Sequence, residues 1–211
     1  MSAPSSVALR YSLLASLVFF LTSCLFVKAP EQKGRIGDDA DLSPLPEIQM
    51  GEDLVRTQEG DMIALLPEGW VFLDARSNVS DDIISVAVNP EYTLSAVFTE
   101  IPGGATTTDA FAAEGLLGLA RTGFNKHARK SAGSVKLVGT YAIAEFGTRR
   151  FGTYSLSGAN GTSVTRCAVF ASTIGHFYEF ALVPLTVSGR DIPGDREQRA
   201  IFNSILTTVQ Y

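Results

Sequence analysis

The histidines and cysteines are the residues of this 211-residue chain whose types could carry nucleophilic or metal chemistry, and there are two of each. His127 and His176 are far apart in the sequence, and neither has a ligand partner at the fourth following residue, so no zinc signature is formed. We expect both at the surface or in turns, with His127 just past a helix and His176 in a hairpin. Cys167 stands in an apolar run with no histidine or acid nearby in the sequence, which is typical of a small buried core residue.

The motifs that cradle phosphates or activate a serine are absent from the sequence. It contains no Gly-x-x-x-x-Gly-Lys, no Gly-x-Gly-x-x-Gly and no Gly-x-Ser-x-Gly. A Ser-His-Asp triad assembled across the fold stays open as an alternative. We therefore predict a protein that is not an enzyme and needs no cofactor or metal, and an uncharacterised hydrolase is the least favoured reading.

The segment before Cys24 has the pattern of a secretory signal. Residues 1–23 hold one charged side chain, Arg10, which precedes a nine-residue apolar run over residues 13–21. A membrane-spanning helix needs about 20 apolar residues, so this run is too short to span, but it has the length of a signal-peptide core. An ordinary secretory peptide or an uncleaved anchor would show the same pattern.

Residues 21–24, Leu-Thr-Ser-Cys, resemble the bacterial lipoprotein box. In that family a peptidase cuts before the cysteine, whose sulfur already carries a diacylglycerol, and a third acyl chain often follows on the new amine. Several acyl chains anchor a protein durably, whereas one does not. The resemblance implies lipid attachment at Cys24, removal of the signal peptide at 1–23, and a place in the cell envelope, anchored to a bacterial membrane and facing the periplasm or the exterior. Because Leu25 is not acidic, it also implies the outer membrane where the cell has one.

Residues 24–53 are predicted to form a flexible acidic linker. This stretch is polar and interrupted by proline and glycine, and at about 5–6 Å times the square root of its length it would span roughly 30 Å. Its acids Asp38, Asp39 and Asp41 lack the ligand spacing of a calcium loop and are interpreted as solvated charges. Over the whole chain, 17 Lys and Arg face 22 Asp and Glu for a net charge of −5, so nothing favours a nucleic-acid partner.

Apolar residues become periodic from about residue 54, which predicts one domain over residues 54–211. Alternating or continuous apolar segments predict strands at residues 61–66, 70–73, 84–88, 94–99, 135–146, 151–156, 164–171 and 177–183. Apolar residues at helical spacing predict helices over residues 109–126 and 195–209. Strands and helices come in separate runs, which is typical of an α+β fold with an antiparallel β-sheet. The strands at 164–171 and 177–183 are apolar on both faces, so we expect the sheet to be flanked by helices on each side.

Residues 63–70, Ile-Ala-Leu-Leu-Pro-Glu-Gly-Trp, resemble the strand and Pro-x-Gly-Trp turn that open PsbP-like domains. These domains are α/β/α sandwiches found in photosystem II extrinsic subunits, in bacterial lipoproteins and in Mog-type Ran-binding proteins. The order of elements over residues 54–211 is similar to theirs. The resemblance implies an α/β/α sandwich that serves as a binding module, and no metal or partner motif of the family is present to be carried over.

A basic cluster at Lys126, His127, Arg129 and Lys130 stands out in a net acidic chain. One interpretation places these cations at the C-terminal end of a helix, where they offset its dipole by roughly 0.3–1 kcal/mol each. The other makes the cluster an interaction patch for an acidic partner or for anionic lipid head groups.

The second half of the chain is rich in aromatic residues, which are expected to fill the core or to line an apolar groove. They are Tyr141, Phe146, Phe151, Tyr154, Phe170, Phe177, Tyr178 and Phe180. From these features we predict a membrane-tethered, non-enzymatic binding or accessory domain with a protein partner. The alternative is a periplasmic carrier of a lipid or another apolar small ligand.

Overall fold

The computed structural model describes residues 44–74, 80–158, 161 and 163–211. The described residues belong to one unit, Leu42–Tyr211. The predicted signal peptide, Cys24 and most of the predicted linker lie outside them. Among the described helices, none is both long enough and apolar enough to cross a membrane.

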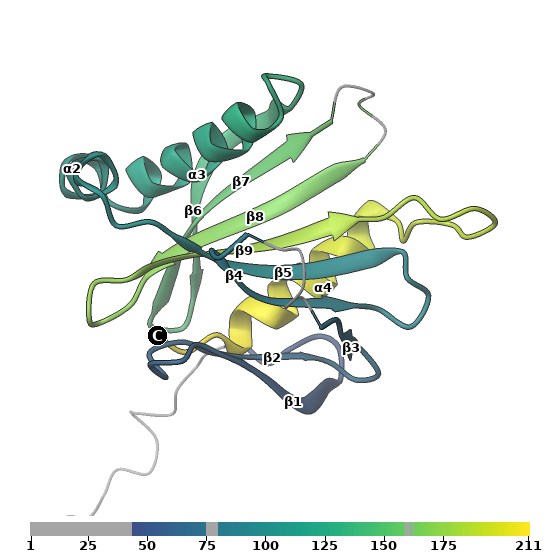
Figure 1. Ribbon diagram of the computed structural model, residues 1–211. Coiled ribbons are helices and arrows are strands. Elements are labelled where there is room, and N and C mark those ends of the chain that lie inside the picture. Colours follow the sequence, from purple (N-terminus) through teal and green to yellow (C-terminus); the bar gives the residue numbers. More distant parts are fainter. Residues whose placement is uncertain (1–43, 75–79, 159–160, 162) are drawn as a thin grey trace, which may run out of the picture. The chain divides into compact units, whose positions relative to one another are not determined.

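A seven-stranded sheet forms the centre of the domain, and every neighbouring pair in it is antiparallel (Figure 1). From one edge to the other its strands are β3 (Val71–Phe72), β4 (Ile83–Val88), β5 (Leu94–Ile101), β9 (Phe177–Pro184), β8 (Val164–Ala171), β7 (Arg149–Ser157) and β6 (Lys136–Phe146). A second sheet has two antiparallel strands, β1 (Met50–Arg56) and β2 (Ile63–Pro67). The long β5–β9 pairing, from Leu94 opposite Pro184 to Ile101 opposite Phe177, joins the two halves of the chain.

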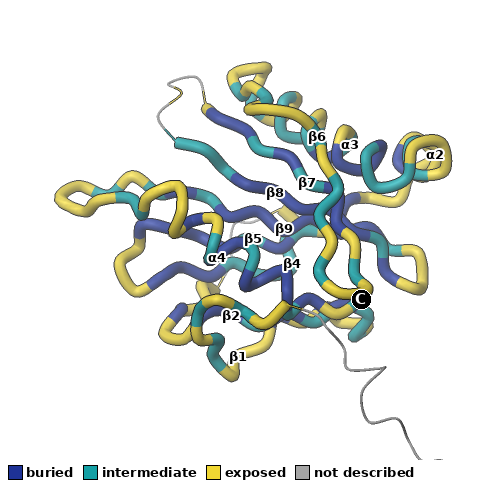
Figure 2. Tube along the Cα trace, turned by 180° about the vertical axis from the view of Figure 1, so that it is seen from behind, coloured by how far each residue is buried: buried dark blue, intermediate teal, exposed yellow. Residues whose placement is uncertain are grey.

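Helices cover both faces of the large sheet, α3 (Leu116–Lys130) on one and α4 (Asp195–Thr208) on the other (Figure 1). Successive residues of a strand point to opposite faces, so β8 serves both. Phe170 packs in the core beside α4, whereas Cys167 and Val169 pack in the core beside α3. Figure 2 shows the resulting distribution, with buried residues along the central strands and exposed ones in the loops. The predicted α+β fold, an antiparallel β-sheet flanked by helices, is confirmed.

The helix predicted over residues 109–126 is two helices in the structure. Helix α2 (Ala105–Glu114) is followed, after Gly115, by α3. Gly115 has a φ of 61°, a left-handed conformation that glycine adopts without steric cost and that ends a helix. Because α3 continues to Lys130, His127 lies inside the helix, and its predicted position just past a helix was wrong.

The two helices and the sheet approach each other closely at glycines. A Cβ atom on Gly118 would lie 2.1 Å from the carbonyl oxygen of Ala110 in α2. A Cβ on Gly152 of β7 would lie 2.3 Å from the carbonyl oxygen of Leu116. These contacts fix α2 against α3 and α3 against the sheet at distances that no larger residue permits.

The domain begins before residue 54, so the predicted end of the linker at residue 53 was too late. Strand β1 starts at Met50, which packs against the core together with Ile48. The backbone N–H of Glu47 donates a hydrogen bond of 2.9 Å to Ser204 Oγ in α4. The acids Glu52 and Asp53 are exposed on β1, which is why the sequence of this strand resembles a solvated linker.

Candidate functional site

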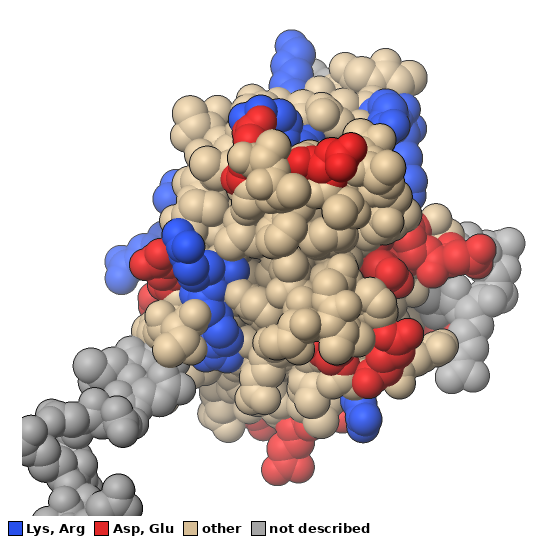
Figure 3. Space-filling view, turned by 90° about the vertical axis from the view of Figure 1, so that its left-hand side faces the viewer, with Lys and Arg blue, Asp and Glu red and all other residues tan. Residues whose placement is uncertain are grey.

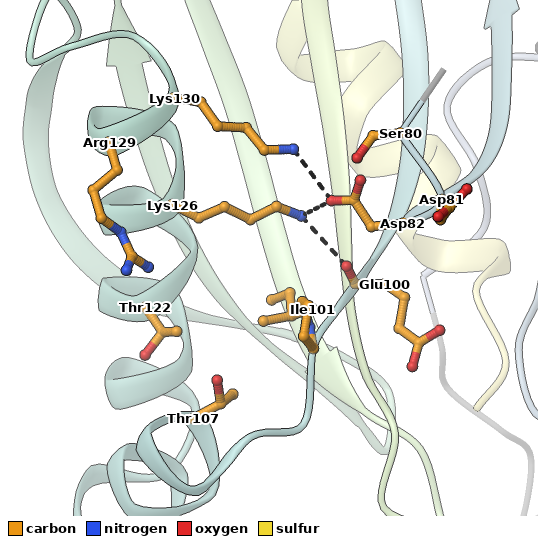
Figure 4. A pocket seen from close by; sticks show the side chains of 11 residues that line it. Ser80, Asp81, Asp82, Glu100, Ile101, Thr107, Thr122, Lys126, Arg129 and Lys130 are labelled. Carbon is orange, nitrogen blue, oxygen red and sulfur yellow. Dashed lines mark hydrogen bonds and ion pairs between the residues drawn. The ribbon is translucent and has the colours of Figure 1, made fainter. Parts of the chain in front are cut away.

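The basic cluster lies at the C-terminal end of α3, as the helix-end interpretation expects. Two of its lysines reach across to the edge of the sheet (Figure 4). Lys126 Nζ forms an ion pair with Asp82 Oδ2 and donates a hydrogen bond of 3.3 Å to the Glu100 carbonyl oxygen. Lys130 Nζ lies 3.4 Å from the same Asp82 oxygen. The two lysines therefore connect the end of α3 to the residue just before β4, and Lys126 also connects it to β5.

A surface groove of about 620 Å³ separates α3 from this edge of the sheet. We call it the α3 groove. It is lined by Ser80, Asp81, Asp82, Glu100, Ile101, Pro102, Thr107, Thr122, Lys126, Arg129 and Lys130. The lining holds three acidic and three basic side chains, so the groove is charged but balanced. In Figure 3 the acidic and basic side chains form small groups, some of which hold both signs, with neutral surface between the groups.

Asp82 is the carboxylate that organises the α3 groove. Burial alone raises the pKa of its carboxyl, but the hydrogen bond and charge of Lys126, with the charge of Lys130, outweigh burial and hold that pKa well below its ordinary value. The Lys126 and Asp82 side chains are each 14% exposed, whereas that of Lys130 is 58% exposed. The Lys126–Asp82 ion pair is thus largely shielded from solvent, whereas the Lys130 side chain is open to solvent and available to a partner.

Arg129 and His127 take other directions. In Figure 4 the Arg129 side chain stays beside its helix and does not reach toward Asp82, and its Nε donates a hydrogen bond of 3.3 Å to the Asn125 carbonyl oxygen. His127 turns toward the sheet, where its Nε2 lies 2.6 Å from Glu179 Oε1. The structure therefore brings Lys126, Arg129 and Lys130 to one groove and directs His127 into the layer beneath the helix.

Glu179 lies on β9 under α3, with its side chain only 1% exposed. Its Oε1 accepts hydrogen bonds from the Tyr154 hydroxyl at 2.8 Å and from His127. Burial raises the pKa of the Glu179 carboxyl, but the hydrogen bonds and charge of its partners, His127 first, outweigh burial and lower that pKa below its ordinary value. A charged carboxylate is therefore kept inside the α3 face of the core.

His176 lies in the turn between β8 and β9, as expected, and belongs to a second polar cluster. Its Nδ1 is 3.2 Å from Glu59 Oε2, 3.4 Å from Asp61 Oδ2 and 3.2 Å from the Tyr178 hydroxyl. That hydroxyl also donates to Asp61 at 2.8 Å. A cavity of about 410 Å³ at this cluster shares Asp81 and Glu100 with the α3 groove.

Sequence patterns could not have revealed either cluster. Asp61 and Tyr178 are 117 residues apart, and His127 and Glu179 are 52 residues apart. One signal was present: Glu179 is an acid within the apolar run of residues 177–183. A buried acid requires a partner, so its position indicates a buried polar pair, although the sequence does not show with which residue.

The aromatic residues of the second half serve mainly as core. Phe180 stacks on Phe98 with ring centroids 4.8 Å apart and on Phe202 of α4 at 5.3 Å. Five further members of the predicted set are buried, namely Phe151, Tyr154, Phe170, Phe177 and Tyr178. Cys167 is buried as expected, and burial raises the pKa of its thiol.

No family model and no curated protein sequence matches the chain. Among solved structures, the chain is similar to cyanobacterial PsbP (CyanoP) from Synechocystis sp., with a TM-score of 0.49 and 16% identity over 84% of this chain and 100% of that chain. It is also similar to the Ran-binding protein Mog1p from Saccharomyces cerevisiae, with a TM-score of 0.45 and 13% identity over 77% of this chain and 96% of that one.

A protein from Bacteroides thetaiotaomicron gives a TM-score of 0.33 and 14% identity over 73% of this chain and 46% of that chain. The first two structures are of the PsbP and Mog types that residues 63–70 resemble. All three TM-scores are below 0.5, and these similarities transfer neither a partner nor an activity.

Proposed function

We propose that this chain is a membrane-anchored lipoprotein whose domain binds a protein partner through the α3 groove and catalyses no reaction. The α3 groove is the observation that carries the proposal. Charged side chains of both signs meet there, contributed by the end of α3 and by the start of β4 and end of β5. Acyl chains on Cys24 would hold the domain at the membrane of the cell envelope, with the outer membrane favoured.

The balance of charge in the α3 groove favours a protein partner over a lipid surface. Anionic head groups attract patches of unpaired cations. Here Lys126 and Lys130 already face Asp82, and the acids Asp81 and Glu100 line the same groove. A protein surface can present acids to Arg129 and bases to Glu100 at the same time, and such complementarity gives specificity.

The packing of the aromatic residues supports a binding domain over a carrier of apolar ligands. A carrier needs an apolar cavity, and the aromatic half of the sequence was its expected source. Phe180 instead stacks between Phe98 and Phe202, and Tyr154 packs under α3. These side chains are occupied by contacts with one another.

Crosslinking from defined positions in native membranes tests the proposal. A photo-crosslinking residue in place of Arg129 should capture one distinct partner, and capture should fall as salt rises because the contact is charged. The matched control is the same residue in place of Arg150, an exposed arginine on β7. Reversing charge with Glu100→Lys should reduce capture at position 129. The same crosslinked partner at positions 129 and 150, or a yield at position 129 that Glu100→Lys does not change, would contradict docking in the α3 groove.

A further inference from the structure

Four side chains from four elements converge beneath helix α3. They are His127 from α3, Tyr154 from β7, Cys167 from β8 and Glu179 from β9. One ligand-type atom each of His127, Cys167 and Glu179 lies within 4.8 Å of the other two. Cys167 and Glu179 are buried, while the His127 side chain is 32% exposed and opens the cluster to solvent. A nitrogen, a sulfur and an oxygen that can each ligate a metal ion thus lie close together, and an ion can reach them from solvent past His127.

One carboxylate oxygen of Glu179, Oε2, has no partner in this arrangement of the described residues. Both hydrogen bonds to its carboxylate end on Oε1, and Oε2 is buried with no hydrogen-bond partner among the described residues. A buried acceptor without a partner costs free energy and calls for an explanation. The helix leaves room beside it because residue 123 is glycine, and a Cβ there would lie 3.4 Å from Oε2 and 2.9 Å from the Tyr154 hydroxyl.

We propose that His127, Cys167 and Glu179 form a binding site for one Zn²⁺ ion or a chemically similar divalent transition metal. Imidazole, thiolate and carboxylate are the three ligand types that Zn²⁺ takes in proteins. Bonds of about 2.0–2.3 Å in a tetrahedral arrangement hold ligand atoms roughly 3.3–3.8 Å apart. The three ligand atoms here lie within 4.8 Å of one another, so a small rearrangement of the side chains brings them to this spacing.

The charges of this cluster suit a divalent ion in a buried place. Zn²⁺ held by one thiolate, one carboxylate and one neutral imidazole carries no net charge, which removes the cost of an isolated charge in the core. Binding breaks the S–H bond of Cys167 and forms a Zn–S bond, and the thiol proton leaves to solvent past His127. His127 Nε2 exchanges its hydrogen bond to Glu179 Oε1 for a bond to the metal, Oε2 of Glu179 gains the partner that it lacks, and Oε1 keeps the hydrogen bond from Tyr154.

The second cluster, Glu59, Asp61 and His176, serves as the internal control. Its ligand atoms are equally close, but Glu59 is exposed and Asp61 is already hydrogen-bonded by Tyr178 and Thr57. It has no buried orphan atom among those identified in the described residues. Substituting His127 and His176 one at a time can therefore distinguish a metal site under α3 from metal binding at the surface around His176.

The test uses the full chain with Cys24→Ser, which leaves Cys167 as its single thiol. Co²⁺ and Zn²⁺ are titrated in turn. We expect one ion per chain, a near-ultraviolet thiolate-to-Co²⁺ absorption band, and protection of Cys167 from a thiol reagent by Zn²⁺. His127→Gln should weaken Zn²⁺ binding at least about 10-fold, and Cys167→Ala should also abolish the band. His176→Gln should change neither result.

Circular dichroism and thermal unfolding show whether each variant remains folded, and His127 is the least buried of the three ligands, with its side chain 32% exposed. Glu179→Gln gives a second reading, because it keeps the shape of the side chain while removing the carboxylate ligand. Three outcomes overturn the proposal: no band with Co²⁺ in the folded Cys24→Ser chain, Zn²⁺ affinity unaffected by His127→Gln, or affinity lost only in His176→Gln. The last outcome would place the metal at the Glu59 cluster.

Discussion

The Nε2 atom of His127 lies 2.6 Å from the Oε1 atom of Glu179, and this contact ties the last turns of α3 to the central strands of the sheet. Within the described part of the chain it is the one hydrogen bond between α3 and β9, and the other contacts on this side of α3 are apolar or involve Tyr154. A carboxylate so deeply buried is costly unless it is paired and hydrogen-bonded. The position of α3, and with it the α3 groove, therefore depends on this pair.

Glu179→Gln should lower the free energy of unfolding by about 1–3 kcal/mol at pH 7, because the side chain keeps its shape but loses charge-assisted hydrogen bonds. The pKa of Glu179 is lowered in the folded protein, so its contribution to stability is present above the ordinary glutamate pKa and is lost as pH falls through the lowered value. Urea unfolding at pH 7, 5 and 3.5 measures the difference between wild type and variant. A difference that does not shrink toward pH 3.5 would contradict this role.

Lys126→Gln should destabilise the domain by about 1–2 kcal/mol, since it leaves the Asp82 carboxylate, 14% exposed, without its main partner. Lys130→Gln is the matched control because it faces the same Asp82 oxygen but is 58% exposed, and its effect should stay within about 0.5 kcal/mol. Thermal and urea unfolding of the two variants under identical conditions compare them. Equal losses of stability in the two variants would show that burial of the Lys126–Asp82 pair does not determine its contribution to stability.

Gly123→Ala should destabilise the protein by about 1–3 kcal/mol, although alanine is normally favoured over glycine inside a helix by about 1 kcal/mol. The reason is that the added Cβ would lie 2.9 Å from the Tyr154 hydroxyl. Gly103→Ala provides the control, because a Cβ there has no atom within 4 Å. The idea fails if Gly123→Ala raises the melting temperature.

A fragment that begins at residue 44 should be more stable than one that begins at residue 54. The longer fragment keeps strand β1, the core contacts of Ile48 and Met50, and the hydrogen bond from Glu47 to Ser204. The shorter fragment exposes the edge of β2 and part of the core beneath it. Thermal unfolding of both fragments checks this, and identical melting temperatures would return the domain boundary to residue 54.

Cys24→Ser should abolish lipid attachment and leave an uncleaved precursor, because the lipoprotein peptidase acts on a cysteine that already carries its lipid. Metabolic labelling with a fatty acid, followed by gel electrophoresis, measures both label and size. Cys167→Ser is the control and should remain labelled. Label retained on the Cys24→Ser protein would rule out the proposed anchor.

The elements were predictable where periodicity reports burial directly. The strand at residues 164–171 was correct to the residue, and its two apolar faces predicted the helices on both sides of the sheet. The errors came from local exceptions. Gly115 breaks a run that reads as one helix, and the exposed acids Glu52 and Asp53 give strand β1 the composition of a linker.

The sites were less predictable than the fold, because their residues meet only through tertiary structure. The basic cluster was visible as four positions within five residues, but nothing local shows that Lys126 finds Asp82 or that His127 turns inward. Cys167 was correctly placed in the core. Its proximity to His127 and Glu179 required the register of β8 on β9 and the close approach of α3.

The pairing of β5 with β9 also sets when this chain can fold. Their paired residues are between 76 and 90 positions apart, and Ile63 exchanges backbone hydrogen bonds with Gln210. Contacts at such separations cost loop-closure entropy and slow folding. A nascent chain cannot complete the β5–β9 pairing of its sheet until residue 184 has been synthesised. The face of the sheet that packs against α4 stays uncovered until that helix has also been made. This strand order therefore delays folding of the domain until synthesis of the chain is nearly finished.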